Sequence, residues 1–151
     1  MRDMDSRQNM FDKMLCFDIY AANLAFGRLY KPMLDQLSLT YPQLLVLLCL
    51  WAEDGRSVGG LGLALSLDSS TLTPMLKRLE TQGLLVRKRD HEDERRVIVS
   101  LTDKGRALQA PAADVLHCTA RSVGFDEDER ALLHEMLLRL RQNLMAATAA
   151  G

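Results

Sequence analysis

The chain has 151 residues, of which 48% are hydrophobic, and its 19 basic and 20 acidic residues leave a formal net charge of −1. This composition excludes an intrinsically disordered protein. The charge balance argues against a non-specific coat for nucleic acid, although a local basic patch would still allow a sequence-specific contact. No stretch approaches the roughly 20 apolar residues of a membrane-spanning helix, so no membrane partner is expected.

The N-terminal run MRDMDSRQNM lacks the apolar segment of a signal peptide, which predicts a cytoplasmic protein with reduced thiols. Cys16, Cys49 and Cys118 are far apart and show no CxxC spacing. That distribution argues against a structural disulfide or a zinc site, and we expect no metal or other cofactor.

Apolar residues at helical spacing predict a first helix over Met10–Tyr30. Pro32 is expected to end this helix, because proline cannot continue the backbone hydrogen-bond ladder, and a short helical piece around Met33–Leu37 follows. A second helix begins near Pro42, which suits a first turn. Its run Gln43–Trp51 is almost wholly apolar, so it should be buried on most sides.

A glycine-rich segment, Val58–Leu65, is predicted to form a short helix that tertiary packing must hold, because each glycine costs roughly 1 kcal/mol against alanine. The capping residues Asp68–Thr71 then open a further helix. That helix runs from about Ser70 to about Gln82 and stops at Gly83.

The hydrophobic period then changes to that of strands. Leu84–Arg89 and Arg96–Leu101 predict two strands of a hairpin, joined by the charged turn Asp90–Arg95. A helix capped by Thr102 follows and is expected to continue to about Arg121.

The last predicted helix begins at a capping-box pattern formed by Asp126 and Glu129, and it carries a leucine-rich stripe. The order of elements predicts a mainly α fold with a small β-hairpin wing: a winged helix-turn-helix over about 43–101. Helices over about 10–38 and 103–147 flank it, and their apolar stripes predict an intertwined homodimer. Residues 1–151 would form a single domain.

One face of the helix predicted over 70–82 suits a nucleic-acid contact. Leu72, Met75, Leu76 and Leu79 mark its core side. The other side has small hydroxyls near the N-terminus and cations further along, which fit bases and phosphates in a major groove. The alternative is an ordinary solvated face. The candidate contacts are Ser69, Ser70, Thr71, Thr73, Pro74, Lys77 and Arg78.

The hairpin tip, within the run RKRDHEDERR, is more highly charged than folding requires. An arginine there suits a minor groove, where narrow A·T-rich DNA concentrates negative potential. Asp93 is placed to orient Arg95 through a bidentate pair. The alternative is a solvated turn. The candidate contacts at the hairpin are Arg87, Arg89, Asp93, Arg95 and Arg96.

The segment GLLVRKRDHEDERRVIVSLTDKGR resembles the wing of MarR-family regulators, with Asp93-x-Arg95 followed by Leu101-Thr102-x-Lys104-Gly105 as the specific signal. The resemblance runs over nearly the whole chain. It implies a homodimer that binds double-stranded operator DNA of pseudo-palindromic sequence, with one recognition helix in each half-site.

Cys16 lies early in the first predicted helix, and the three tyrosines, Tyr20, Tyr30 and Tyr41, all fall in the same N-terminal region. Phenolic hydroxyls can donate hydrogen bonds to a thiolate, which stabilises a nucleophilic and oxidisable sulfur. The alternative is that Cys16 is a small buried hydrophobic residue. Cys49, inside the apolar run LLVLLCLW, is expected to be inert core.

The segment LCFDIYAANLAFGRLYKPMLDQLSLTYPQ resembles the organic-hydroperoxide-sensing (OhrR) branch of the MarR family. The resemblance implies that Cys16 is the peroxidatic residue. It also implies that Tyr30 and Tyr41 bond its sulfur, typically across the dimer interface, with Tyr20 in a supporting role. Some members carry a resolving cysteine at the place of Cys118, which implies an intersubunit Cys16–Cys118 disulfide. The alternatives are an external thiol as resolving partner and Cys118 as a spare thiol.

The predicted function is a redox-sensing transcriptional repressor and not an enzyme. An organic hydroperoxide would oxidise Cys16, the disulfide with Cys118 would form, and operator DNA would be released. One rival is a MarR-type repressor that responds to a small aromatic or phenolic ligand, with Cys16 incidental. Two further rivals are a thiol peroxidase and a dimer that binds no DNA.

Overall fold

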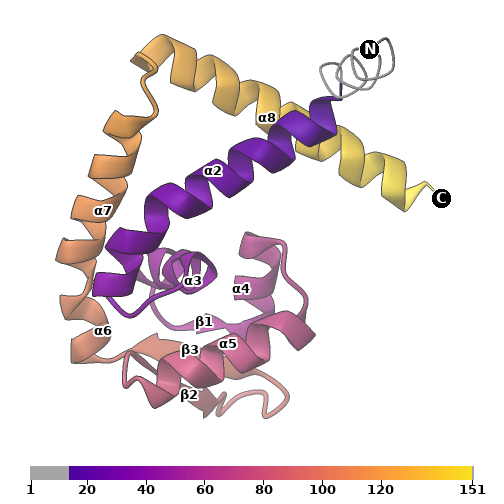
Figure 1. The fold of residues 1–151 in the computed structure, drawn as a ribbon. Coiled ribbons are helices and arrows are strands. Elements are labelled where there is room, and N and C mark those ends of the chain that lie inside the picture. Colours follow the sequence, from indigo (N-terminus) through magenta and orange to yellow (C-terminus); the bar gives the residue numbers. More distant parts are fainter. Residues whose placement is uncertain (1–13, 151) are drawn as a thin grey trace, which may run out of the picture. The chain divides into compact units, whose positions relative to one another are not determined.

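The computed structural model describes residues 14–150, and Figure 1 labels their helices and strands. In chain order these are α2 (Leu15–Gln36), α3 (Tyr41–Ala52), β1 (Arg56–Ser57), α4 (Val58–Leu65), α5 (Ser69–Thr81), β2 (Leu85–Arg89), β3 (Val97–Leu101), α6 (Asp103–Ala107), α7 (Gln109–Ser122) and α8 (Glu127–Ala149). The chain divides into two compact units, one ending at Val115 and the other beginning at Leu116. The predicted start of the first helix, at Met10, lies outside the described residues.

The core of the first unit is built on α3, whose Leu44, Leu47 and Leu50 are fully buried. A capping box fixes the start of this helix: the Thr40 hydroxyl accepts from the Gln43 amide at 3.4 Å, and the Gln43 side chain accepts from the Thr40 amide at 2.9 Å. The buried, proline-started helix predicted at this place is therefore confirmed.

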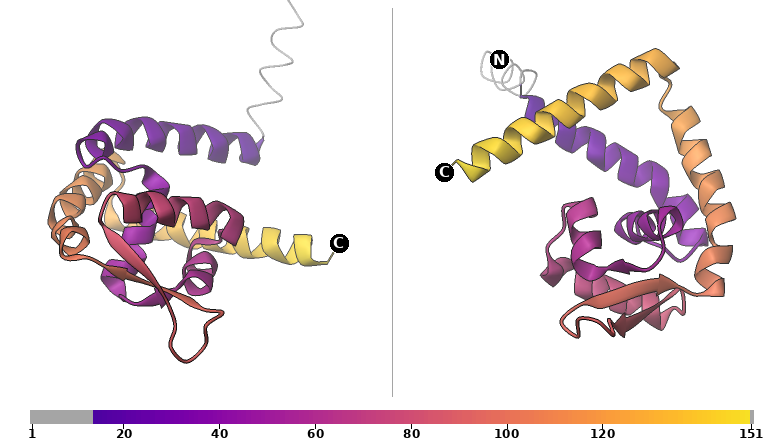
Figure 2. Two further views of the ribbon diagram at one scale, coloured as in Figure 1. Left: turned by 90° about the horizontal axis from the view of Figure 1, so that it is seen from below. Right: turned by 180° about the vertical axis from the view of Figure 1, so that it is seen from behind.

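The wing is a three-stranded antiparallel sheet of order β1-β3-β2. The predicted hairpin is confirmed, with Leu85 opposite Leu101 and Arg89 opposite Val97. Its loop projects beyond the helices of the first unit (Figure 2, left). The short strand β1, which pairs through Arg56 with Val99, was not predicted, because two residues are too few to show a period of two.

The bounds of the two helices that precede the hairpin, α4 and α5, are set by capping residues. The α4 helix has the predicted bounds, and its cap is Ser57, whose hydroxyl accepts from the Gly60 amide at 3.0 Å. The α5 helix is capped by Asp68 and is followed by Gly83. Gly83 has a φ of +73°, a left-handed conformation that glycine adopts without strain.

The prediction that Pro32 ends the first helix is wrong. The α2 helix continues through Pro32 to Gln36. A proline inside a helix costs about 3 kcal/mol. Burial of Leu34, which is 2% exposed, offsets much of that cost, because burying a leucine side chain contributes roughly 1.5–3 kcal/mol.

The prediction of one continuous helix from Thr102 to about Arg121 is also wrong. The α6 helix ends at Ala107, and α7 begins at Gln109. Pro111 explains the break, since it has no N–H to donate to the Ala107 carbonyl, as a continuous helix would require. In the observed structure Pro111 lies in the first turn of α7, where that N–H is not needed.

The second unit contains the C-terminal part of α7 and all of α8, which begins at the predicted capping box: the Asp126 carboxylate accepts from the Glu129 amide at 2.9 Å. None of the residues of α8 is buried. Its exposed apolar side chains are Leu132, Leu133, Met136, Leu137, Leu144 and Met145. In the first unit, α2 likewise exposes Leu15, Phe17 and Leu24. Such apolar faces suit burial against another chain, and the intertwined homodimer stays a prediction.

Within residues 14–150, no single helix is long and apolar enough to cross a membrane. Taken together, α2 and α3 would reach the length and apolar composition of a membrane span, but they are bent by 71° at their junction. Much of α3 is buried in the core of the first unit.

Candidate nucleic-acid interface and thiol site

The α5 helix has one buried and one open face. Leu72, Leu76 and Leu79 are fully buried, which confirms most of the predicted core side, whereas Met75 is only half-buried. The predicted contacts Thr73, Pro74, Lys77 and Arg78 are all exposed. A hollow of about 470 Å³ lies beside them, lined by Gln43, Pro74, Lys77, Arg78, Thr81 and Gln82. Two cations next to an open hollow provide the chemistry that a phosphate requires.

The N-terminus of α5 is held by Asp68. Its carboxylate accepts from the Ser70 hydroxyl at 2.5 Å and from the Thr71 amide at 2.8 Å. These bonds, that of Ser70 first, hold the pKa of the Asp68 carboxyl below its ordinary value. Ser69, Ser70 and Thr71 remain exposed, so the cap fixes the place of three small polar residues without covering them.

Arg87 is placed differently from the other candidate arginines. Its guanidinium donates to a Glu80 carboxylate oxygen at 2.8 and 3.0 Å, and its amide donates to the other oxygen at 2.9 Å. The Arg87 side chain is only 26% exposed. The pair joins the C-terminal part of α5 to β2. Arg87 therefore holds the helix and the hairpin together, whereas in the described part of the chain the other candidate arginines of the hairpin do not pair with α5.

Replacing Glu80 with glutamine should lower the free energy of unfolding at neutral pH by about 1 kcal/mol, the size expected for a partly exposed charge-assisted contact. The hydrogen bonds from the Arg87 guanidinium, followed by the bond from its amide, lower the pKa of Glu80. A carboxyl group whose pKa is lower in the folded protein than in the unfolded chain stabilises the fold. Its contribution is complete above the pKa of the unfolded chain, about 4, and is lost as the pH falls through the pKa of the folded protein. Urea unfolding at several pH values should therefore show wild type and variant converging in acid. A difference that stays constant down to pH 3 would contradict this.

At the wing tip, Arg95 is free to reach a partner: its side chain is 94% exposed. A single Asp93 oxygen accepts from the Arg95 amide at 3.1 Å and from Nε at 3.3 Å. The pair is therefore not bidentate, and Asp93 shapes the turn as well as the side chain. Arg96 pairs with Asp90 at 3.7 Å, at the base of the loop. Arg89 is exposed on β2.

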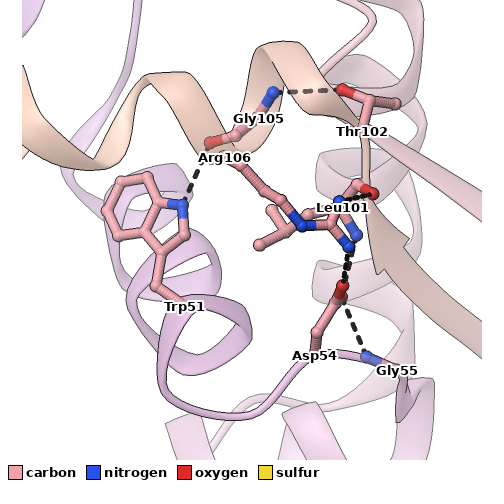
Figure 3. A network of polar contacts seen from close by, with 7 residues as sticks. All are labelled: Trp51, Asp54, Gly55, Leu101, Thr102, Gly105 and Arg106. Carbon is pink, nitrogen blue, oxygen red and sulfur yellow. Dashed lines mark hydrogen bonds and ion pairs between the residues drawn. The ribbon is translucent and has the colours of Figure 1, made fainter.

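A polar cluster that the sequence analysis did not single out lies where β3 meets α6 (Figure 3). One Asp54 oxygen accepts from the Gly55 amide at 2.9 Å and from the Leu101 amide at 2.8 Å. The other oxygen pairs with Arg106 at 2.5 Å. The indole Nε1 of Trp51 donates to the Gly105 carbonyl at 3.0 Å. We call Trp51, Asp54, Leu101, Gly105 and Arg106 the corner cluster.

Cys16 is exposed near the start of α2, with exposed Tyr20 one helical turn further on. Tyr30 lies fourteen residues beyond Cys16 in the same helix. That is about 21 Å along the axis at about 1.5 Å per residue, so Tyr30 of the same chain is out of reach of the Cys16 sulfur.

Tyr30 and Tyr41 form an aromatic pair, with ring centroids 4.8 Å apart. They edge a cavity of about 770 Å³ lined by Asn23, Leu24, Phe26, Gly27, Arg28, Tyr30, Lys31, Tyr41 and Pro42. The two tyrosines that the OhrR resemblance assigns to the thiol are thus brought together at one place on the first unit.

The other two cysteines differ in surroundings. Cys49 is half-buried in α3, and Cys118 is exposed on α7. Cys16 belongs to the first unit and Cys118 to the second.

Comparison with known proteins assigns the family. A family model described as the transcriptional regulator SarA/Rot matches residues 28–110. The organic hydroperoxide resistance transcriptional regulator of Bacillus subtilis (strain 168) is 50% identical over 113 residues, which cover 72% of this chain and 77% of the relative. The chain belongs to the MarR/SarA-type winged-helix transcriptional regulators. The resemblance to the MarR family and the predicted winged-helix fold are therefore confirmed.

Two solved structures of another regulator, AbfR of Staphylococcus epidermidis, are similar to this MarR/SarA-type chain. Reduced AbfR bound to DNA has a TM-score of 0.76 and 36% identity, and the match covers 94% of this chain and 99% of AbfR. Disulfide-formed AbfR has a TM-score of 0.66 and 34% identity, with 93% and 98% covered.

Proposed function

We propose that this regulator is a DNA-binding repressor that senses organic hydroperoxides through Cys16. The observation that carries the proposal is the exposed Cys16 near the start of α2, together with Tyr30 further along the same helix, which pairs with Tyr41 of α3 beside an open cavity. The 50% identical relative from Bacillus subtilis is named for organic hydroperoxide resistance, and the AbfR similarity includes a DNA-bound form.

DNA would be bound by α5 and the wing. The open face of α5 supports insertion in a major groove, with Lys77 and Arg78 toward phosphates. Arg95 at the wing tip would enter the adjacent minor groove. In a homodimer, two copies of this surface would read the halves of a pseudo-palindrome.

The thiol site would be completed by the partner subunit. Because Tyr30 of the same chain is about 21 Å from Cys16 along α2, the tyrosine pair can bond this sulfur only from a second copy. In the proposed dimer, the start of the partner's α2 would enter the cavity beside that pair. Exposed Leu15, Phe17 and Ile19 would give the thiol an apolar setting that favours an organic peroxide.

The chemistry has two balanced steps. The Cys16 thiolate attacks one peroxide oxygen, the O–O bond breaks, and the alkoxide leaves as the alcohol after it takes a proton, with Cys16 oxidised to the sulfenic acid. The Cys118 thiol of the other subunit then attacks that sulfur, a disulfide forms, and water leaves. The disulfide would alter the spacing of the two recognition helices, so DNA is released.

The test begins with DNA selected from a random-sequence duplex pool by the reduced wild-type protein. Cumene hydroperoxide should then abolish binding to the selected duplex and produce a covalent dimer on a non-reducing gel. Dithiothreitol should reverse both effects. Failure to enrich any sequence would contradict the repressor, and unchanged DNA binding by oxidised protein would contradict the sensor.

A second candidate, a regulator that responds to a small aromatic ligand, is favoured by one observation: the same cavity is lined by Phe26, Tyr30 and Tyr41. A phenolic compound that displaces the selected duplex from protein with all thiols reduced would support this alternative.

A further inference from the structure

The corner cluster joins three elements through a single carboxylate. Asp54, in the turn after α3, bonds the amide of Leu101 at the end of β3 and the guanidinium of Arg106 in α6. Arg106 closes the set by donating from its other terminal nitrogen to the Leu101 carbonyl at 2.9 Å. Figure 3 shows these bonds converging between the α3 turn and α6.

The same corner also holds the end of the α5 helix and the start of β2. The Thr102 hydroxyl donates to the Gly83 carbonyl at 2.6 Å, and Lys104 Nζ donates to the Gln82 carbonyl at 2.8 Å. At Gly105 the backbone lies so close that an added Cβ would overlap the Leu84 carbonyl oxygen. Both proposed DNA-reading elements, α5 and the hairpin, are therefore attached to the segment that Asp54 anchors.

The Asp54–Arg106 pair fixes the orientation of the hairpin more than it adds to the free energy of unfolding. Its side chains are 32% and 53% exposed, and ion pairs in such positions add little to the free energy of unfolding. Apolar packing beneath the sheet is not directional, so it tolerates small rotations of the hairpin. Hydrogen bonds are directional, and those of Asp54 select one orientation.

We propose that Asp54 is a positioning residue for DNA binding: through Leu101 and Arg106 it fixes the wing and the end of α5 at the angle to α3 that places both in adjacent grooves. This proposal rests on the proposed function. It predicts that loss of the Asp54–Arg106 link weakens DNA binding although neither residue touches DNA.

The test uses Asp54→Asn in the full-length protein with the selected duplex. Asparagine keeps an oxygen for the Gly55 and Leu101 amides but turns an N–H₂ toward Arg106, so it removes the ion pair alone. Glu53→Gln is the matched control. It removes the same charge one residue earlier, from the Glu53–Arg56 pair, which joins the residue after α3 to the start of β1. Loss of a negative charge by itself should favour DNA binding.

Asp54→Asn should bind the duplex about tenfold more weakly than wild type, a loss opposite in sign to the charge effect, while Glu53→Gln binds at least as tightly as wild type. Trp51 supplies a structural readout, since it is the only tryptophan in the sequence and its N–H bonds Gly105. The indole N–H signal in an NMR spectrum should move in Asp54→Asn and stay in Glu53→Gln.

Equal binding by both variants and wild type would overturn the proposal, as would equal weakening by both. If Asp54→Asn does not fold, Arg106→Lys decides instead. It keeps the charge but loses the planar two-pronged contact, so it should also weaken binding. If the wild-type protein enriches no duplex, the proposed function fails. An indole signal that moves in Asp54→Asn but not in Glu53→Gln would then still show that the corner is oriented by Asp54.

Discussion

The Cys16→Ser protein should stay bound to its selected DNA duplex after treatment with cumene hydroperoxide. Serine has nearly the shape of cysteine, but its hydroxyl cannot be oxidised by a peroxide. Because the serine hydroxyl can accept the same hydrogen bonds from tyrosine as the thiol does, the substitution should change neither folding nor the affinity of the reduced protein. The expected result is complete loss of peroxide-induced release, measured by fluorescence anisotropy with labelled duplex.

The other two cysteines provide matched controls for that experiment. Cys49→Ser, a substitution at a half-buried position of α3, should leave the response to peroxide as it is in the wild type. Cys118→Ser should still consume one equivalent of peroxide at Cys16 but give no covalent dimer on a non-reducing gel. Release from DNA by Cys16→Ser protein would show that another group senses the peroxide. A covalent dimer of Cys118→Ser protein would remove Cys118 from the mechanism.

Much of the fold could be predicted because its signals are local. The core face of α5 follows from the spacing of its leucines, and its start from the capping residue Asp68. Gly83 marks its end because that position needs a left-handed backbone. In each case the residues that carry the signal are within a few positions of the structure they determine.

The two wrong helix boundaries show how tertiary packing and proline interact. Pro32 was expected to end a helix, but the burial of Leu34 keeps α2 continuous. Pro111 lies inside the single helix that the sequence predicts from Thr102 to about Arg121, yet it divides α6 from α7 because the Ala107 carbonyl is left without its donor. Whether a proline ends a helix depends on what its neighbours bury, and the local sequence does not contain that information.

The candidate contacts could be predicted as a surface but not sorted by role. Arg87 and Arg95 look alike in the sequence, but Glu80 engages the first while the second is almost fully exposed. Asp54 carried no signal, because its partners Leu101 and Arg106 are 47 and 52 positions away. Such long-range polar contacts depend on the packed arrangement of helices and strands.

Arg95→Ala should lower affinity for the selected duplex by about tenfold to a hundredfold, the usual cost of losing one specific arginine contact to DNA. The Arg95 side chain is 94% exposed, and its ion pair with Asp93 is an exposed one at 3.3 Å. Its removal should therefore leave the melting temperature unchanged. A dimer that does not bind DNA through its wing would be indifferent to this change.

Lys88→Ala is the matched control for Arg95, since it removes one positive charge from an exposed position on the same hairpin. If Arg95 lies in a narrow minor groove, its loss should also abolish the preference for A·T over G·C pairs at the flanks of the duplex, because the groove width that attracts arginine depends on those pairs. Loss of a general phosphate contact at Lys88 would weaken binding equally to duplexes with A·T-rich flanks and to duplexes with G·C-rich flanks. Anisotropy titrations with A·T-rich and G·C-rich flanks separate the two effects. Equal behaviour of Arg95→Ala and Lys88→Ala would reduce the wing tip to a non-specific cation.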